Sequence, residues 1–217
     1  MASTDSDRVV FMAGCDGPLA HSLVGALSGP GVKLALHAEY RKGIEHLIDL
    51  ARGRGATAIS VSDEATEPDR PLLRPAAERC IRELGRIDLA VQADGFDASS
   101  FPRSICDPEN VAWWPHAWTE LRTAAELVAG VAPFVARGGR VVVLTPARSA
   151  EAGPLFAAAA AAFESLLPAA RAELESAGAG LVAVPVEPFD LRDWSCFGET
   201  PSSLVAVAGR VVSAATA

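Results

Sequence analysis

The stretch that decides the fold runs from Gly138 to Phe163, GGRVVVLTPARSAEAGPLFAAAAAAF. A Gly-Gly pair typical of a turn leads into the β-branched run Val141–Leu144, which is typical of a buried strand. A loop with two prolines and a glycine follows, and an alanine-rich helix is expected from about Leu155. This order of strand, loop and helix predicts one unit of a parallel sheet that is covered by helices.

The rest of the chain repeats this alternation. Apolar runs typical of strands lie at residues 8–13, 32–38, 56–61, 86–91 and 181–186. Helical segments are expected at residues 21–27, 41–52, 71–84, 114–136, 155–176 and 202–215. The alternation predicts an α/β protein with a doubly wound, Rossmann-like parallel sheet. No repeat or linker divides the chain, so we expect a single domain over residues 1–217.

Composition excludes several classes of function. The chain has 217 residues, of which 50% are hydrophobic, so one domain with a sizeable core is expected. Its net charge of -8 and the lack of a Lys/Arg-rich run argue against a nucleic-acid surface. The four cysteines are scattered and form no Cys-x-x-Cys pair, so no metal site is expected. The polar N-terminus and the broken apolar runs predict a soluble, cytoplasmic protein without a membrane segment.

A glycine-rich turn follows the first predicted strand. Gly14, Gly17 and Ala20 form a Gly-x-x-Gly-x-x-Gly/Ala pattern between that strand and a helix. Small residues in such a turn let the backbone approach a pyrophosphate, which the helix N–H groups then face. Asp16 adds a negative charge beside that position, and Pro18 removes one donor. The pattern therefore indicates either a dinucleotide site or a tight strand-to-helix turn that binds no ligand.

Together, this turn and the Gly138–Phe163 stretch resemble the short-chain dehydrogenase/reductase family. That family places a Ser just after the strand and a Tyr-x-x-x-Lys at the start of the helix. The matching positions here are Pro146, Phe156 and Ala160. In the family the Tyr hydroxyl transfers the alcohol proton, the Lys lowers the pKa of that hydroxyl, and the Ser polarises the carbonyl. The resemblance thus implies a catalytically degenerate form, a pseudoenzyme on an oxidoreductase scaffold.

The same resemblance implies further cofactor positions. After the second strand, Arg41 or Lys42 is suited to the extra phosphate of NADP and Glu39 to the ribose of NAD, or these are solvated charges. Asp63 matches an aspartate beside the adenine, or caps a helix. Gly95 is the one residue shared with the family's Asn-Asn-Ala-Gly, which here is Gln92-Ala-Asp-Gly.

Losing those asparagines is expected to remove the side-chain amides that brace the cofactor and the central strands, and Asp94 adds an anion. The candidate cofactor residues match the motifs of the family only in part. They are Gly14, Gly17, Ala20, Arg41, Asp63 and Gly95. We expect no bound cofactor, or weakly bound NAD(P).

Two residues of the predicted helix 114–136 are candidates for acid/base chemistry. Counting along the family pattern places Glu120 where the family has an Asn that orders a water. Glu120 is either an acid/base group in the cleft or an exposed carboxylate. His116 lies among three tryptophans and is either a base or a packing residue.

The resemblance also implies an interface. In the family, the helices that match 114–136 and 155–176 pack against their counterparts in a neighbouring subunit. Alanines 157–162 permit close approach, and Phe163, Leu166 and Leu174 lie on one apolar stripe, which the chain's own sheet also needs. Pro168 predicts a kink in this helix. The chain is expected to lack the family's last strand.

Three functions remain open from the sequence. The leading hypothesis is a non-catalytic subunit that pairs with itself or with an active paralogous dehydrogenase. A second is a repurposed non-redox enzyme, such as an isomerase, cyclase or dehydratase, that uses carboxylates of the cleft. A third is a residual NAD(P)-binding oxidoreductase.

Overall fold

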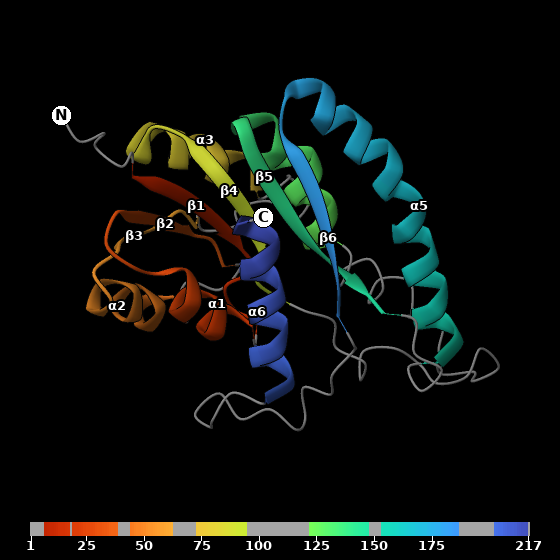
Figure 1. Ribbon diagram of the computed structural model, residues 1–217, viewed down its shortest axis with the longest axis horizontal. Coiled ribbons are helices and arrows are strands. Elements are labelled where there is room, and N and C mark those ends of the chain that lie inside the picture. The colour runs from red at the N-terminus through yellow and green to blue at the C-terminus, as the bar shows by residue number, and fades with distance from the viewer. Residues whose placement is uncertain are drawn as a thin grey trace.

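A parallel sheet of six strands forms the centre of the computed structural model (Figure 1). The structure describes residues 7–17, 19–38, 44–62, 73–94, 122–147, 153–186 and 202–216. The strands are β1 (Arg8–Ala13), β2 (Val32–Leu36), β3 (Thr57–Ser60), β4 (Ile87–Gln92), β5 (Val135–Pro146) and β6 (Gly180–Val186). Their order is β3-β2-β1-β4-β5-β6, and each adjacent pair is parallel. The doubly wound α/β sheet expected from the sequence is therefore confirmed.

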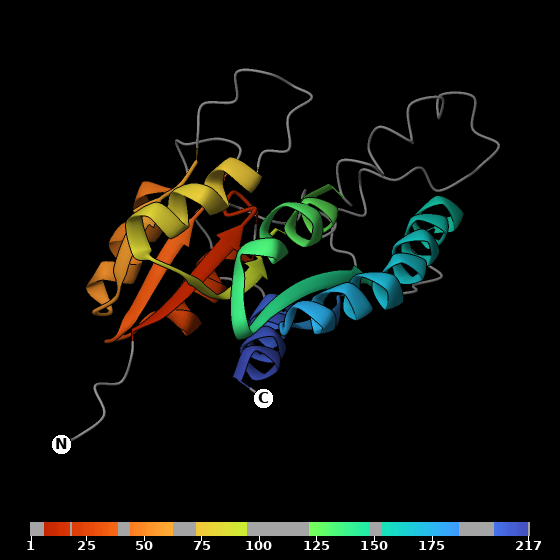
Figure 2. The ribbon, with the colours of Figure 1, turned by 90° about the horizontal axis from the view of Figure 1, so that it is seen from above.

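Helices cover both faces of this sheet, as Figure 2 shows from above. On one face lie α1 (Ala20–Leu27), α2 (Glu45–Gly53) and α6 (Ser202–Thr216). On the other lie α3 (Leu73–Leu84), the helical turns that end at η4 (Leu127–Val131) and η5 (Ala132–Phe134), and α5 (Gly153–Ala177). Burial on both faces explains why the strands are near-continuous apolar runs rather than alternating ones.

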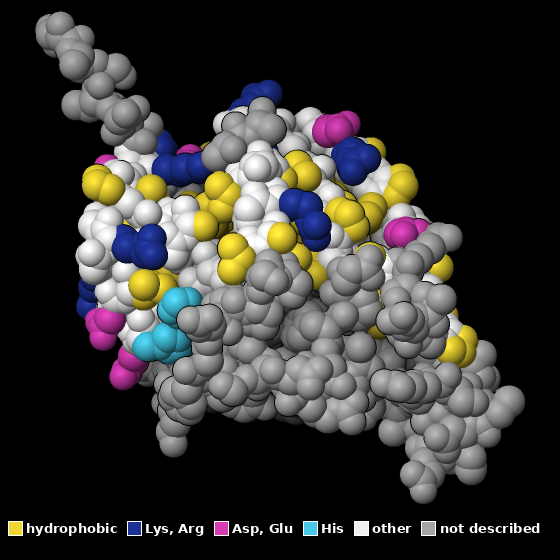
Figure 3. Space-filling view, turned by 60° about the horizontal axis from the view of Figure 1, so that its bottom comes forward, with side chains coloured by type: hydrophobic (Ala, Val, Ile, Leu, Met, Phe, Trp, Pro, Cys, Tyr) yellow, Lys and Arg dark blue, Asp and Glu magenta, His cyan; other side chains and the backbone are white. Residues whose placement is uncertain are grey.

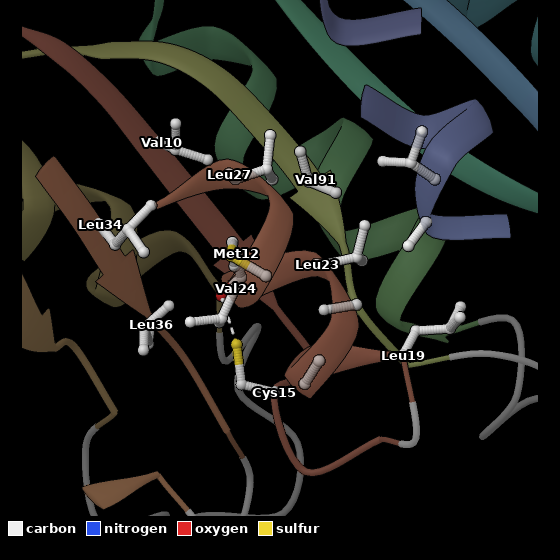
Figure 4. Packing of buried hydrophobic residues seen from close by; sticks show 14 of the residues in the cluster. Val10, Met12, Cys15, Leu19, Leu23, Val24, Leu27, Leu34, Leu36 and Val91 are labelled. Carbon is white, nitrogen blue, oxygen red and sulfur yellow. Dashed lines mark hydrogen bonds between the residues drawn. The ribbon is translucent and has the colours of Figure 1, made fainter. Parts of the chain in front are cut away.

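The two faces build two hydrophobic clusters. Val10 and Met12 of β1 belong to one cluster, and Val9 and Phe11 belong to the other, because successive side chains of a strand point to opposite faces. Figure 4 shows the first cluster, in which Leu23 of α1 lies over the sheet near Met12. The sheet is therefore sandwiched between two apolar layers.

The predicted boundary between helix 114–136 and strand 141–144 is wrong. The helix ends at Phe134, and β5 already begins at Val135. The Gly138–Gly139 pair lies within β5, where the pairing with β4 jumps from Ile87–Val135 to Leu89–Arg140. Gly138 has a φ of 79°. The glycines therefore mark an irregularity inside a strand rather than a turn before it. The part of this helix before residue 122 lies outside the described residues.

Helix α5 starts two residues before its predicted beginning and runs on through Pro168. Its axis changes direction along its length in Figure 2, as a proline within a helix predicts. Phe163 and Leu174 are buried against the chain's own sheet, whereas Leu166 is 60% exposed. The predicted apolar stripe is thus divided between the core and the surface.

Candidate functional site

The candidate site lies at the carboxyl edge of the sheet. All six strands are parallel, so their last residues meet at this edge, and the strand order reverses between β1 and β4. Ligands of open α/β sheets bind at such a reversal point. The glycine-rich turn that follows β1 and Asp94 that follows β4 are both at this point.

The backbone of the turn is held by its neighbours. Gly14 has a φ of 75°, a conformation that favours glycine. The Cys15 N–H donates to the His37 carbonyl at 2.8 Å, and the Ala93 N–H donates to the Ala13 carbonyl at 2.7 Å. Helix α1 begins at Ala20. The predicted order of strand, glycine turn and helix is confirmed.

Asp94 packs directly onto this turn. A Cβ atom added to Gly14 would lie 2.8 Å from the Cβ of Asp94, and one added to Gly17 would overlap the Cα of Asp94. Real Cβ atoms do not approach other atoms this closely. Both glycines are therefore required by a residue of the chain itself, whether or not a ligand binds.

The carboxylate of Asp94 titrates near neutral pH. Burial raises its pKa from 3.8 to about 7, hydrogen bonds from the Thr123 hydroxyl and the Gln92 amide lower it, and the charge of Asp16 raises it. The Gln92 Nε2 donates to the Asp94 Oδ1 at 2.7 Å. A partly buried carboxyl group with this pKa is chemically able to donate or accept a proton at pH 7.

Gln92 also braces the central strands. Its fully buried side chain accepts a hydrogen bond from the Leu144 N–H of β5 at 2.9 Å through Oε1. The expectation that replacing the family's asparagine removes this bracing amide is wrong for the strands. Glutamine carries the same amide on a longer side chain and satisfies a backbone donor that the β4–β5 ladder leaves unpaired.

The matching positions of the family's Tyr and Lys are deep in the core. Phe156 and Ala160, in the first two turns of α5, are both completely buried. Phe156 belongs to the same hydrophobic cluster as Leu144 and Val186, near the carboxyl ends of β5 and β6. Pro146 ends β5 and pairs in register with Val186. No group at Phe156 or Ala160 can transfer a proton.

Solved structures resemble this arrangement over nearly the whole chain. A short-chain oxidoreductase of Thermus thermophilus is 25% identical, with a TM-score of 0.65, and the match covers 94% of each chain. A short-chain dehydrogenase of Mycobacterium smegmatis has a TM-score of 0.72 at 17% identity, over 97% of this chain and 86% of the other. A dehydrogenase/reductase of Sinorhizobium meliloti has a TM-score of 0.71 at 16% identity, over 95% and 86%. The fold is that of the short-chain dehydrogenase/reductases.

No protein-family model matches the sequence, and no curated protein matches it. The likeness to short-chain dehydrogenases thus lies in the three-dimensional structure and in partial motifs. It supports the family resemblance at the level of the scaffold, on which different chemistries are found.

Several candidate residues lie outside the described part of this dehydrogenase-like fold: Arg41, Asp63, Gly95, His116 and Glu120. Their roles stay predictions. At the end of β2, the described residues are His37, which is buried, and Ala38, whose N–H donates to the Ser62 Oγ at 2.9 Å. Neither carries the carboxylate that binds an NAD ribose or the guanidinium that suits NADP.

The described cysteines are inert and no metal cluster accompanies them. Burial raises the pKa of the Cys15 thiol far above its usual range and that of Cys80 to about 12. Within the ranges that the structure describes, no group of three or more His, Cys, Asp or Glu residues is arranged to hold a metal ion. Within these same ranges, no helix is long and apolar enough to span a bilayer.

Sequence reasoning missed the contact between Asp94 and the glycine turn. It identified Asp94 as an added anion near the cofactor groove, but the contact joins residues 77 positions apart, Gly17 and Asp94. The signal available was the coincidence of two features: a glycine turn after β1 and an acidic residue two positions after β4. In a sheet where β1 and β4 are neighbours, those two positions meet.

Proposed function

We propose that this protein is a non-catalytic subunit with a short-chain dehydrogenase scaffold, which pairs with itself or with an active paralogous dehydrogenase. The observation that carries the proposal is Phe156, a fully buried phenyl ring at the position of the family's proton-donating Tyr. Ala160, equally buried, stands at the position of the Lys. The chain thus keeps the helix and fills its catalytic face with core-forming side chains.

The glycine turn supports weak or absent binding of NAD(P). Its close neighbour is Asp94, which packs against both Gly14 and Gly17. Asp16, within the turn, adds a second negative charge. The Asp16 carboxylate, together with Asp94 where it is deprotonated above its pKa of about 7, opposes the binding of a pyrophosphate by like-charge repulsion.

The outer face of α5 supports the role as a subunit. It carries exposed small or apolar side chains that include Ala157, Ala158, Ala161, Ala162 and Leu166. The inner face carries Phe163 and Leu174, which the sheet already covers. Alanines on an exposed helix let a second helix approach closely, and Leu166 supplies apolar area for the contact.

The test combines a turnover assay with native mass spectrometry. Purified protein is incubated with NADH or NADPH and a panel of carbonyl substrates, and separately with paralogous dehydrogenases from its own genome. We expect no turnover, no saturable cofactor binding below millimolar concentration, and a homo- or hetero-oligomer. Ordinary turnover with NAD(P), or a protein that stays monomeric alone and with every paralogue, would refute the proposal.

A second candidate function rests on Asp94. A carboxyl group with a pKa near 7, hydrogen-bonded by Gln92 and Thr123 at the reversal point, suits proton transfer without a redox cofactor. Such chemistry includes isomerisation, cyclisation and dehydration, for which Glu120 and His116 are further candidates. This function would be favoured over the first by an activity that Asp94→Asn abolishes. The rate of that activity should change with pH around 7, where Asp94 titrates.

A further inference from the structure

We propose that His21 and His46 form a two-histidine site for a divalent transition-metal ion such as Ni²⁺ or Zn²⁺, which bridges α1 and α2. The two residues come from helices that follow consecutive strands and are 25 positions apart in the chain. The proposed function uses neither histidine, so this site goes beyond it.

The two imidazoles are already neighbours, with their rings stacked. Their ring centroids are 6.4 Å apart, and their planes are inclined by only 15°. Both side chains are exposed, and Figure 3 shows the pair together on the surface with acidic side chains beside it. Neither ring makes a hydrogen bond or ion pair to another described residue, so both rings keep their nitrogen lone pairs available.

This spacing is close to that of two imidazoles on one metal ion. With a metal–nitrogen bond of about 2.1 Å, each ring centre lies about 3.2 Å from the metal, so the two centres are about 5.2 Å apart at a tetrahedral angle and about 6.4 Å apart in a linear arrangement. The nitrogen lone pairs lie in the planes of the rings, so side-chain rotations that turn both rings toward one metal ion and bring their centres about 1 Å closer give the tetrahedral geometry. Exposed side chains make such rotations freely.

The surroundings suit a cation whose remaining positions are filled by water. Glu45 and Asp49 are exposed carboxylates on α2, and Asp49 follows His46 by three positions, on the same helix face. Their charges offset the positive partial charge of the first turns of α1 and α2. Imidazole nitrogens are preferred ligands of Ni²⁺, Cu²⁺ and Zn²⁺, whereas Mg²⁺ and Ca²⁺ prefer oxygen ligands.

The experiment titrates the full chain with Ni²⁺ and, separately, with Zn²⁺ at about pH 7.5 under a non-chelating reductant, where imidazole is mostly neutral. Calorimetry gives affinity and stoichiometry, and thermal unfolding is followed in parallel. We expect one saturable equivalent and a melting temperature that rises by about 2–4 °C, because the metal binds the folded state only. Each of His21→Gln and His46→Gln should weaken binding by more than about tenfold, since even outer-sphere changes cost about 10- to 100-fold.

His116→Gln, the same substitution elsewhere in the chain, serves as the control and should leave binding unchanged. Because His21 and His46 are exposed, their substitution should not disturb folding. The melting temperatures of the metal-free variants, compared with that of the metal-free wild type, check this. The proposal is overturned if the wild-type chain shows no saturable binding up to millimolar metal. It is also overturned if a variant that carries both His21→Gln and His46→Gln binds the metal as tightly as the wild type does. Weaker binding in His116→Gln alone would overturn it as well.

Discussion

At the scale of single residues, Asp94 has the largest effect on the site. It follows β4 and packs onto the glycine turn that follows β1, at the reversal point of the sheet. The same packing raises its pKa to about 7. Stability and charge at this position are therefore linked.

Asp94 makes the stability of the protein depend on pH. Its pKa is about 7 in the folded chain against 3.8 for an unperturbed group, so the folded state holds the proton more tightly. The stabilisation is complete below about pH 4 and is lost as the pH rises through about 7. We expect Asp94→Asn to reduce this loss of stability with rising pH. The urea concentration at the midpoint of unfolding measures stability from about pH 4.5 to about pH 8, a range that includes the folded-state pKa of about 7. Asp49→Asn, at an exposed position, should keep the wild-type slope, and an equal slope in Asp94→Asn would contradict the assignment.

The fold itself requires Gly17, whether or not a cofactor binds. Its added Cβ would overlap the backbone of Asp94, so Gly17→Ala should lower the free energy of unfolding by about 1–3 kcal/mol or more in cofactor-free protein. Gly29→Ala is the control, since nothing lies within 4 Å of a Cβ there. Equal denaturant midpoints for the two variants would show that the turn is not packed as described.

At the scale of elements, α5 separates a packed inner face from an exposed outer one. Phe156, Ala160 and Phe163 point into the core, whereas Leu166 faces outward. Strands β4 and β5 are joined by their backbone hydrogen bonds and by the bond from the Leu144 N–H to the amide oxygen of Gln92. The elements follow the short-chain dehydrogenase/reductase fold, and Phe156, Ala160 and Gln92 are buried within it.

The ring of Phe156 should behave as a core residue. Phe156→Ala leaves a cavity among apolar neighbours and should lower the free energy of unfolding by about 3–5 kcal/mol. Leu166→Ala, on the same helix but 60% exposed, should change it by less than about 1 kcal/mol. Chemical denaturation of the two variants measures the difference, and similar losses for both would place Phe156 at the surface.

At the scale of the whole molecule, the proposed subunit role requires an exposed surface that binds another helix. The two large hydrophobic side chains most exposed among the described residues are Leu166 on α5, at 60%, and Val205 on α6, at 55%. They lie on helices that cover opposite faces of the sheet. A pair of substitutions therefore distinguishes the two surfaces.

Leu166→Asp should dissociate an oligomer that forms through α5, because it places a charge in an apolar contact. Val205→Asp, with the same change of chemistry on α6, should leave the oligomer intact. Sedimentation velocity at several concentrations measures both. Dissociation by Val205→Asp alone would move the interface to α6.

Much of the fold was predictable from local sequence. The strand at residues 8–13 and the helix that begins at 202 agree with the structure, since each has an apolar run or a helical spacing bounded by clear signals. The boundary near Gly138 was not predictable. A glycine pair marks a turn and an irregularity within a strand equally well, and only the pairing with β4 distinguishes them.

The sequence by itself determined the α/β alternation, the glycine turn and the absence of a hydroxyl or amine at Phe156 and Ala160, because these depend on residue type and local spacing. Only the tertiary structure decided that Asp94 packs against the glycine turn, that Gln92 braces β5, and that the apolar stripe of α5 is divided between core and surface. Those features depend on which strands are neighbours. Strand order is settled by packing across the whole sheet, which no local pattern contains.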